Sequence, residues 1–193
     1  IATIAKEQLM KYDTVSLLNG LVVSCIAATD GYEVELANGH CYRSKKLVFA
    51  TGIKDIMPAI PGFAESWGIS VLHCPYCHGY EVRQQKTGIL ANGDVAMEFA
   101  ALISNWTSDL TIYTNGPSVL LPEQMTKLQK HKIKIVEDRI ARFDHDNGYI
   151  NHIVFENGCS KPVSALYDRL PFLQHTSIPV DLGCQLTAEG YIK

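Results

Sequence analysis

The stretch TGILANGDVAMEFAALISNW, residues 87–106, changes its hydrophobic period part-way along. TGILA at its start is a short apolar run typical of a buried strand. Asn92 and Gly93 then turn the chain, and Asp94 is the expected N-cap of a helix. The apolar residues of that helix recur on one face: Val95, Phe99, Leu102 and Ile103. Because DLTIYT further on has the composition of a second strand, residues 87–113 predict a β-α-β unit.

The segments that follow extend this alternation of helix and strand. PEQMTKLQKH, residues 122–131, predicts a second helix because proline is favoured in a first helical turn. The sequences IKIVE, RIARFD, YINHIVFE and ALYDRLPFL then read as strands, and we expect a β-meander there. The sequence therefore predicts an α/β fold in which a Rossmann-like domain combines a central parallel sheet with a β-meander.

The first fifty residues predict a helix followed by strands. One face of the helix carries Ile1, Ile4, Ala5 and Leu9. The segments TVSLLN, LVVSCIAA, YEVELA and KKLVFA are β-rich and are separated by Asn-Gly and Asp-Gly turn signals. Residues 47–50 are expected to form a buried strand, and the proline-containing loop after Gly52 is typical of a crossing between domains.

The turn between strand and helix carries a nucleotide-binding pattern with one departure. In G-x-G-x-x-G/A the glycines permit a tight turn, the approach of a pyrophosphate and close helix packing, and the helix N-terminus holds the phosphate. Here the pattern occupies Ala91, Asn92, Gly93, Asp94, Val95 and Ala96. Because the first glycine is an alanine, a nucleotide site and a plain strand-to-helix turn both remain open.

The residues that would choose between NAD and NADP are not in their usual place. About twenty residues after the fingerprint an acid favours NAD, and arginines favour NADP. The chain has TNG there, at 114–116, and the nearest cations are Lys127 and Lys130 on the next predicted helix. The sequence therefore predicts weak discrimination between NADPH and NADH.

Composition and charge exclude several classes of function. The chain has 193 residues, is 47% hydrophobic and carries a formal net charge of −3. Without a sustained basic cluster, neither a nucleic acid nor an acidic membrane surface is expected as a partner. No apolar run approaches the roughly 20 residues of a membrane span. Four scattered cysteines are expected to be small buried hydrophobes, which fits a reducing compartment such as the cytoplasm: Cys25, Cys41, Cys159 and Cys184.

A closely spaced cysteine pair lies in SVLHCPYCHGYEV, residues 70–82, between His73 and His78. Cys74 and Cys77 stand one helical turn apart, which lets a small disulfide ring close. The two residues before His73 are strand-like, so the cysteines are expected to open a helix. A helix N-terminus and an imidazolium both lower a thiol pKa, so a redox dithiol is the favoured interpretation. Two alternatives stay open. A structural zinc site needs a second spaced pair, which the sequence lacks, and buried cysteines can simply pack.

In this order the motifs resemble the low-molecular-weight thioredoxin reductase-like flavoprotein family. The resemblance rests on LVFATG at 47–52, HCPYCHGYE at 73–81, ANGDVA at 91–96 and LGCQLTAEGYIK at 182–193. The CPYCHGYE form is similar to a branch that includes fungal dithiol oxidases of the gliotoxin type. Conventional members carry an aspartate directly after the second cysteine, where this chain has His78, and an arginine cluster where it has TNG.

The resemblance implies a nicotinamide domain inserted in a split FAD domain. Residues 1–53 would be the middle of the FAD domain, residues 54–172 the NAD(P)-binding domain with its CxxC pair, and residues 173–193 the return to the FAD domain. The opening glycine fingerprint and closing Gly-Asp motif of the family are not in this sequence. We therefore expect an internal piece of a longer enzyme, with an incomplete FAD site and inactive by itself, whose full-length form is a homodimer.

The resemblance also implies an electron path from NADPH or NADH through FAD to the Cys74–Cys77 disulfide and on to an outside disulfide. Cys77 would face the flavin, and Cys74 would exchange with a thioredoxin-like protein or a small molecule. His78 would protonate the leaving thiolate. Further cofactor-binding residues are expected at Val22, Val23, Thr51 and Gly52. The alternatives are a dithiol oxidase that uses oxygen, and a non-catalytic nucleotide-binding or zinc-stabilised module.

Overall fold

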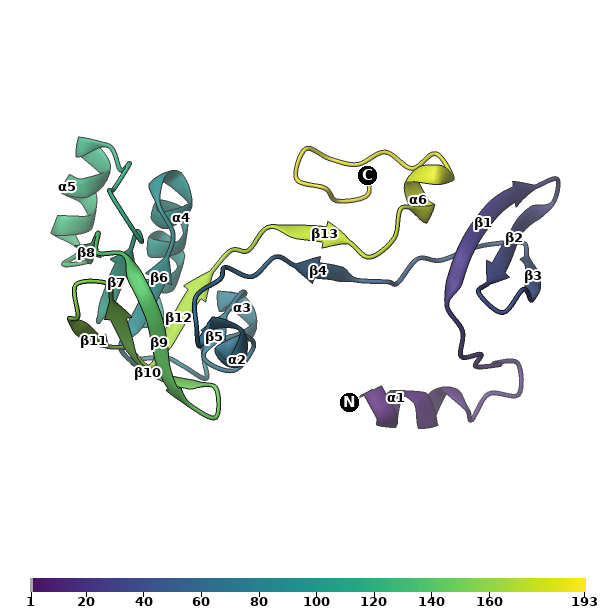
Figure 1. Cartoon of the computed structure of the whole chain (residues 1–193), viewed down its shortest axis with the longest axis horizontal. Helices are drawn as coiled ribbons and strands as arrows, with labels where there is room; N and C mark the ends of the chain where they lie inside the picture. Colours follow the sequence, from purple (N-terminus) through teal and green to yellow (C-terminus); the bar gives the residue numbers. More distant parts are fainter. Residues whose placement is uncertain (1) are drawn as a thin grey trace. The chain divides into compact units, whose positions relative to one another are not determined.

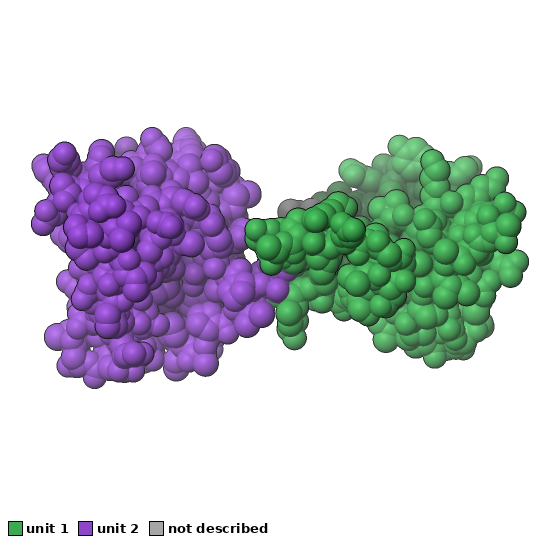
Figure 2. All heavy atoms as spheres, turned by 90° about the horizontal axis from the view of Figure 1, so that it is seen from above, with its two compact units in different colours: residues 1–54, 173–193 green, residues 55–172 purple. Residues whose placement is uncertain are grey.

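The computed structural model describes residues 2–193, and the chain divides into two compact units (Figure 1). Unit 1 consists of residues 1–54 and 173–193, and unit 2 consists of residues 55–172. Figure 2 colours unit 1 green and unit 2 purple. Ile1, expected on the apolar face of the first helix, lies outside the described residues.

Unit 2 is built on a five-stranded parallel sheet in the order β5-β12-β6-β7-β8. Its strands are β5 (Val71–Leu72), β6 (Thr87–Leu90), β7 (Leu110–Tyr113), β8 (Lys134–Val136) and β12 (Ala165–Asp168). The connecting helices are α3 (Pro75–His78), α4 (Gly93–Ile103) and α5 (Pro122–Lys130). Since α4 joins β6 to the parallel strand β7, the predicted β-α-β unit at 87–113 is confirmed.

The sheet separates two hydrophobic cores because successive side chains along a strand point to opposite faces. Ile89 and Tyr167 lie in one core with Phe99 of α4 and Leu128 of α5. Leu166, one residue before Tyr167, lies in the other core. Parallel strands that are covered on both faces read as continuous apolar runs, which is why these strands show no alternation in sequence.

The second core is closed by a meander of three antiparallel strands in the order β11-β10-β9 and by helix α2 (Phe63–Ser66). The strands are β9 (Ile140–Asp146), β10 (Tyr149–Phe155) and β11 (Ser160–Pro162). A meander is therefore present, as expected. Two segments assigned to it were placed wrongly, because IKIVE and ALYD form β8 and β12 of the parallel sheet. The composition of a short apolar strand fits either the parallel sheet or the meander, and only the strand with which it pairs shows which of them it joins.

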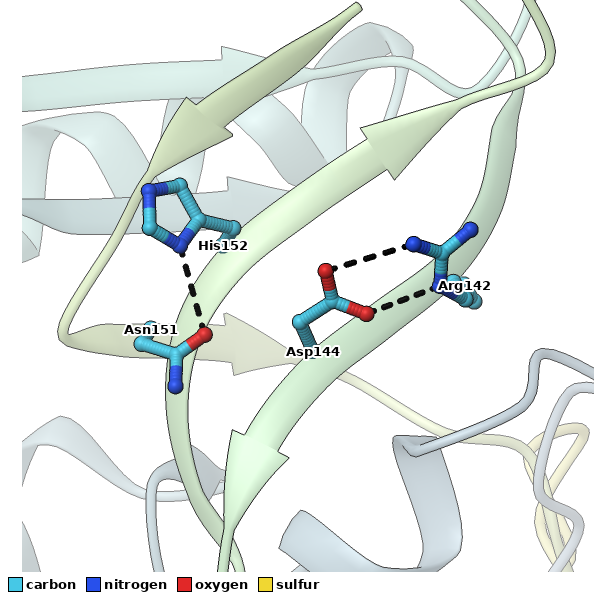
Figure 3. A network of polar contacts seen from close by, with 4 residues as sticks. All are labelled: Arg142, Asp144, Asn151 and His152. Carbon is cyan, nitrogen blue, oxygen red and sulfur yellow. Dashed lines mark hydrogen bonds and ion pairs between the residues drawn. The ribbon is translucent and has the colours of Figure 1, made fainter. Parts of the chain in front are cut away.

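A bulge bends the meander at Asn151, an extra residue on β10 relative to β9. Its carbonyl accepts a hydrogen bond from the backbone N–H of Val163 at 3.1 Å. Figure 3 shows the polar side chains at this surface, where Arg142 donates to Asp144 at 2.8 Å and His152 lies 3.3 Å from the Asn151 amide oxygen. Exposed ion pairs contribute about 0–1 kcal/mol. The buried core, and not this network, therefore stabilises the meander.

Unit 1 contains a three-stranded antiparallel sheet in the order β1-β2-β3. Its elements are α1 (Ala2–Leu9), β1 (Val22–Ala28), β2 (Gly31–Leu36), β3 (Cys41–Ser44) and α6 (Ile178–Asp181). Of the three predicted turns, those at Asp30-Gly31 and Asn38-Gly39 connect these strands, whereas Asn19-Gly20 does not form a turn. β4 (Ile53–Asp55) and β13 (Phe172–Gln174) pair with each other where the chain passes from one unit to the other.

Unit 1 buries little apolar surface. Among its described residues, the buried apolar side chains are Cys25, Leu36, Ile178 and Pro179, and α1 buries none. The predicted strands at 14–19 and 45–50 are wrong, since neither segment forms a strand, and Val48 is 85% exposed. A strand needs a neighbour for its backbone N–H and C=O groups, and no described segment pairs with residues 45–50.

Truncation of Ile153 tests the second core. Ile153 is fully buried between the meander and the sheet, so Ile153→Ala is expected to lower the free energy of unfolding by about 2–5 kcal/mol. Tyr149→Ala, on the same strand but 67% exposed, is the matched control and should change it by less than about 0.5 kcal/mol. Urea unfolding followed by circular dichroism measures both, and equal effects would contradict the burial of β10.

Candidate functional site

The cysteine pair lies where β5 passes into α3. Cys74 is the N-cap of α3, with extended backbone angles of φ −117° and ψ 109°. Pro75 occupies the first helical turn, where its fixed φ suits the helix and its missing N–H is not needed. The backbone N–H of Cys77 donates to the Cys74 sulfur at 3.3 Å. The prediction that a short strand precedes the pair and that the pair opens a helix is thereby confirmed.

The two thiols are free and in direct contact. The Cys77 thiol donates to Cys74 Sγ, and the sulfur atoms are 2.7 Å apart. A disulfide bond has a length of about 2.05 Å. The two sulfurs are therefore already positioned so that a small local movement closes the ring.

The shared hydrogen bond makes the two cysteines chemically different. Donation from the Cys77 thiol is the largest influence that lowers the pKa of Cys74, and the backbone N–H groups of Cys77 and Tyr76 add to it. The same hydrogen bond raises the pKa of Cys77, which must give up the donated proton, and the charge on Glu81 acts in the same direction. When the pair loses its first proton, the thiolate resides on Cys74, and a thiolate is the reactive form of cysteine.

The two histidines do not contact the sulfurs. His78 is exposed at the end of α3, and its side chain has no hydrogen bond within residues 2–193. The ring of His73 packs edge-on against Trp67, with 6.5 Å between ring centroids. The described part of the chain holds no group of three or more His, Cys, Asp or Glu side chains that could bind a metal. An acid role for His78 stays a prediction.

The expectation for the scattered cysteines was wrong for three of them. Cys25 is buried, and burial raises the pKa of its thiol. Cys41, Cys159 and Cys184 are exposed. Each of the three lies next to a turn at the surface, so the apolar character of a free cysteine did not determine its burial.

The turn at residues 91–96 is held by Asn92, which replaces Asp94 as the N-cap of α4. The Asn92 amide oxygen accepts from the backbone N–H of Gly93 at 3.0 Å and from that of Val119 at 2.9 Å. The Asn92 amide nitrogen donates to the carbonyl of Pro117 at 2.9 Å. Gly93 has φ +59°, a left-handed conformation that glycine adopts without strain. α4 therefore begins two residues before the expected Val95.

One backbone donor that a pyrophosphate would use is engaged within the chain. The N–H of Gly93 is bonded to Asn92, and a Cβ at position 93 would lie 3.3 Å from a methyl group of Val119. The carboxylate of Asp94 accepts from Gln124 at 2.7 Å and carries negative charge at the helix N-terminus. Val95 and Ala96 follow inside α4. A bound phosphate would therefore have to displace Asn92 and share the helix end with Asp94.

The residues that replace the nucleotide-specificity side chains are also engaged. The Thr114 hydroxyl donates to the carbonyl of Gly116 at 2.6 Å. The Asn115 amide oxygen accepts from the backbone N–H of Ile140 at 2.8 Å, with Asn115 at φ +52°. Lys127 and Lys130 lie on α5, as expected. The loop at 114–116, between β7 and α5, is thus hydrogen-bonded to the start of β9 and presents no charge to a ribose or a 2′-phosphate.

A hollow of about 410 Å³ lies within unit 1. Of the residues expected to bind FAD, Val22 and Thr51 line it, together with apolar neighbours such as Phe49, whereas Val23 and Gly52 do not. Its apolar walls fit part of a flat aromatic ring system. The described residues of unit 1 contain no glycine-rich strand-to-helix turn for a pyrophosphate, so the hollow fits only part of FAD.

Sequence reasoning missed two residues at the end of β12, Tyr167 and Asp168. Parallel strands place their carboxyl ends at one edge of the sheet, so the CxxC turn after β5 and the turn at 91–96 after β6 share that edge. Because β12 lies between β5 and β6, Asp168 lies between the two turns. Burial raises the pKa of Asp168 to about 7. A buried strand that ends in an acid was the available signal, but ALYD had been assigned to the wrong sheet.

A Rossmann-like domain with an N-capping dithiol at its carboxyl edge defines a redox protein of the nucleotide-dependent type. The family model for pyridine nucleotide-disulphide oxidoreductases matches residues 4–190. The chain belongs to this family, whose members generally use FAD and NAD(P)H. Its fold, as expected, is that of the thioredoxin reductase-like proteins.

Individual relatives agree with this assignment. The chain is 36% identical to "Thioredoxin reductase tcpT" of Claviceps purpurea over its whole length, which covers 63% of that protein. It is 29% identical to "Thioredoxin reductase aclD" of Aspergillus oryzae, over 93% of this chain and 60% of that one. The chain thus spans about three fifths of the length of these relatives.

Solved structures show the same fold over nearly all of the chain. The structure of HlmI matches with a TM-score of 0.88 and 25% identity, over 99% of this chain and 61% of that one. A putative thioredoxin reductase, TrxB from Bacillus anthracis, matches with a TM-score of 0.86 and 28% identity, over 97% and 63%. Within residues 2–193, the structure has no helix with the length and apolar character needed to cross a membrane.

The dithiol geometry predicts an unequal pair that oxidises reversibly. Under air the peptide with Cys74 and Cys77 should resist alkylation until a reductant is added, because the sulfurs are close enough to join. In the reduced chain at neutral pH, iodoacetamide should label Cys74 before Cys77, since the pKa of Cys74 is lowered and that of Cys77 is raised. Peptide mass spectrometry measures both, and complete labelling under air without reductant would contradict the disulfide.

Asp168 predicts a pH dependence of stability. Its folded pKa of about 7 lies above the ordinary value of 3.8. Between these values the folded chain holds a proton that the unfolded chain has released, so stability falls as the pH rises. Asp168→Asn should therefore stabilise the chain at pH 8, on the order of 2–4 kcal/mol, and lose this advantage below about pH 4.

Urea unfolding at pH 4, 6 and 8 measures this difference. Asp146→Asn, at an exposed position of the β9–β10 turn, is the control and should show no such trend. A stabilisation by Asp168→Asn that is the same at pH 4 and at pH 8 would show that the carboxyl group is not the cause.

Proposed function

We propose that the full-length protein is a thiol-disulfide oxidoreductase whose Cys74–Cys77 pair exchanges electrons with FAD on one side and with an outside disulfide or dithiol on the other. The observation that carries this proposal is the contact of the two sulfurs at 2.7 Å, with opposite pKa shifts. A structural or metal-binding pair has no need of one low-pKa and one high-pKa thiol. The names of the relatives, which are thioredoxin reductases, support the same chemistry.

The reducing direction follows from the order in which the two thiols ionise. The Cys74 thiolate attacks one sulfur of the substrate disulfide, and the other substrate sulfur leaves as a thiolate. Cys77 then attacks Cys74 Sγ, which releases the second substrate sulfur and forms the Cys74–Cys77 disulfide. The proton of Cys77 passes to one of the two substrate thiolates, and His78, exposed beside the pair, is the proposed acid for that transfer. Two electrons reach the substrate.

The cofactor arrangement is part of the same proposal. Residues 1–53 and 173–193 would belong to the FAD domain, and residues 54–172 to the nicotinamide domain. FAD, when bound, supplies the two-electron exchange that regenerates the dithiol, and Val22 and Thr51 would contact one of its rings in the hollow of unit 1. The proposed substrates are a thioredoxin-like protein or a small-molecule disulfide, and the proposed full-length assembly is a homodimer.

A second candidate is a dithiol oxidase that uses oxygen, and the structure of the turn at 91–96 favours it. The turn at 91–96 is capped by Asn92, carries the charge of Asp94 and lacks specificity side chains at 114–116. Each feature weakens the binding of a nicotinamide nucleotide. In an oxidase the electrons run from a substrate dithiol to the Cys74–Cys77 disulfide and finally to oxygen, so that no nucleotide is needed.

Steady-state kinetics on the full-length protein test both candidates. Reduction of a disulfide probe with NADPH or NADH measures the reductase, and oxygen consumption with dithiothreitol measures the oxidase. Cys74→Ser should lower either activity by at least about 100-fold, because it removes the nucleophile. Cys159→Ser, at an exposed cysteine in the β10–β11 turn, is the control and should leave both unchanged.

The comparison of NADPH with NADH tests whether this chain recognises the 2′-phosphate. We expect kcat/KM to differ by less than about tenfold between NADPH and NADH, roughly 1.4 kcal/mol, because no acid or arginine follows β7. A preference of a hundredfold would show that another side chain, such as Lys127 or Lys130, contacts the 2′ position. Full activity of Cys74→Ser in both assays would exclude both candidates.

A further inference from the structure

Tyr167 carries a buried hydroxyl that has no hydrogen-bond partner among residues 2–193. Its side chain is fully buried in the core that it shares with residues of α4 and α5. Buried polar groups are almost always hydrogen-bonded, because an unpaired one loses its hydration without compensation. A phenylalanine at this position would fill the same apolar space without that loss. Packing alone therefore does not explain why this position carries a tyrosine.

The sheet register places Tyr167 beside the strand that leads to Cys74. Tyr167 pairs with Leu72 across the parallel strands β12 and β5, and paired residues point to the same face. Cys74 comes two residues after Leu72, and the chain bends at His73 between them. Cys74 therefore lies just beyond the carboxyl end of β5, next to the strand that carries Tyr167.

The two groups also interact electrostatically. Burial, together with negative charge on Cys74 and on Glu81, raises the pKa of Tyr167 to about 12. The phenol is therefore protonated at physiological pH and can only donate toward a nearby thiolate. Cys77 and Glu81 are the other titratable groups that act on the cysteine pair.

We propose that Tyr167 is a positioning residue for Cys74, and that its hydroxyl stabilises the Cys74 thiolate when Cys77 no longer donates to it. In the dithiol, Cys74 Sγ accepts from the thiol and the backbone N–H of Cys77. When the Cys74–Cys77 disulfide is opened at Cys77 to regenerate the dithiol, Cys74 leaves as a thiolate while Cys77 has no proton to donate. The Cys74 thiolate then lacks its strongest donor. A small rotation of Cys74, or one bridging water, brings the Tyr167 hydroxyl into that place.

This inference rests on the proposed function for its purpose, but its test needs neither a cofactor nor a substrate. The reduced chain is alkylated with iodoacetamide between pH 5 and pH 10, and the Cys74 peptide is quantified by mass. The comparison is made in a Cys77→Ala background, where no disulfide forms and the Cys77 thiol cannot donate. Tyr113→Phe is the matched control, since Tyr113 is an equally buried tyrosine on β7 whose hydroxyl bonds with Thr111.

In this background, Tyr167→Phe should raise the midpoint of Cys74 alkylation by about one pH unit, which is about a tenfold slower reaction below the midpoint. With Cys77 present the shift should be smaller, so the double-mutant cycle reports a coupling between the two donors. The urea midpoint should be unchanged or higher, because the variant removes an unpaired polar atom.

Three results would overturn the proposal. They are an unchanged midpoint in the Cys77→Ala background, an equal shift from Tyr113→Phe, and a lower urea midpoint for Tyr167→Phe, which would show that the hydroxyl already has a partner. The kinetic test of Cys74→Ser on the full-length protein is independent of this titration. If the kinetic test contradicts the proposed function, the titration result still holds. If the titration contradicts the role of Tyr167, the kinetic result still holds.

Discussion

The pairing of β12 between β5 and β6 is the constraint on which the rest of unit 2 depends. Residues 165–168 return from the far end of the meander to complete a parallel sheet whose other strands begin at residue 71. Because all five strands run in one direction, every loop that follows a strand meets the same edge. The dithiol, Asp168 and the glycine turn are thereby brought together, although they lie far apart in sequence.

The two turns at this edge are built in opposite ways. In the CxxC turn the hydrogen bonds run between the two reactive sulfurs and leave one of them with a lowered pKa. In the turn at 91–96 the side chain of Asn92 satisfies the backbone donor that a phosphate would otherwise use. The first arrangement leaves the Cys74 thiol ready to react, whereas the second occupies the backbone N–H of Gly93 within the chain. The CxxC turn is therefore suited to thiol chemistry, and the turn at 91–96 disfavours the binding of a phosphate.

The two units differ in how much of their apolar surface is covered. Unit 2 encloses a core on each face of its sheet. Unit 1 buries four apolar side chains within its described residues and leaves others, such as Leu21 and Val48, largely in solvent. Hydrophobic burial is the main favourable contribution to folding. Unit 2 therefore has the physical basis for stability within these residues, whereas the sheet of unit 1 relies mainly on its hairpin hydrogen bonds.

The sequence by itself determined the local features: the strand–turn–helix at residue 87 onward, the hairpin turns of unit 1 and the helix that begins at the CxxC pair. These depend on neighbouring residues, through periodicity, glycine and proline geometry and N-capping. Only the tertiary structure decided which sheet IKIVE and ALYD join, that residues 45–50 have no partner strand within residues 2–193, and that Tyr167 pairs with Leu72, two residues before Cys74. Strand pairing and burial join residues distant in sequence, and the composition of a short apolar segment does not indicate which strand it pairs with.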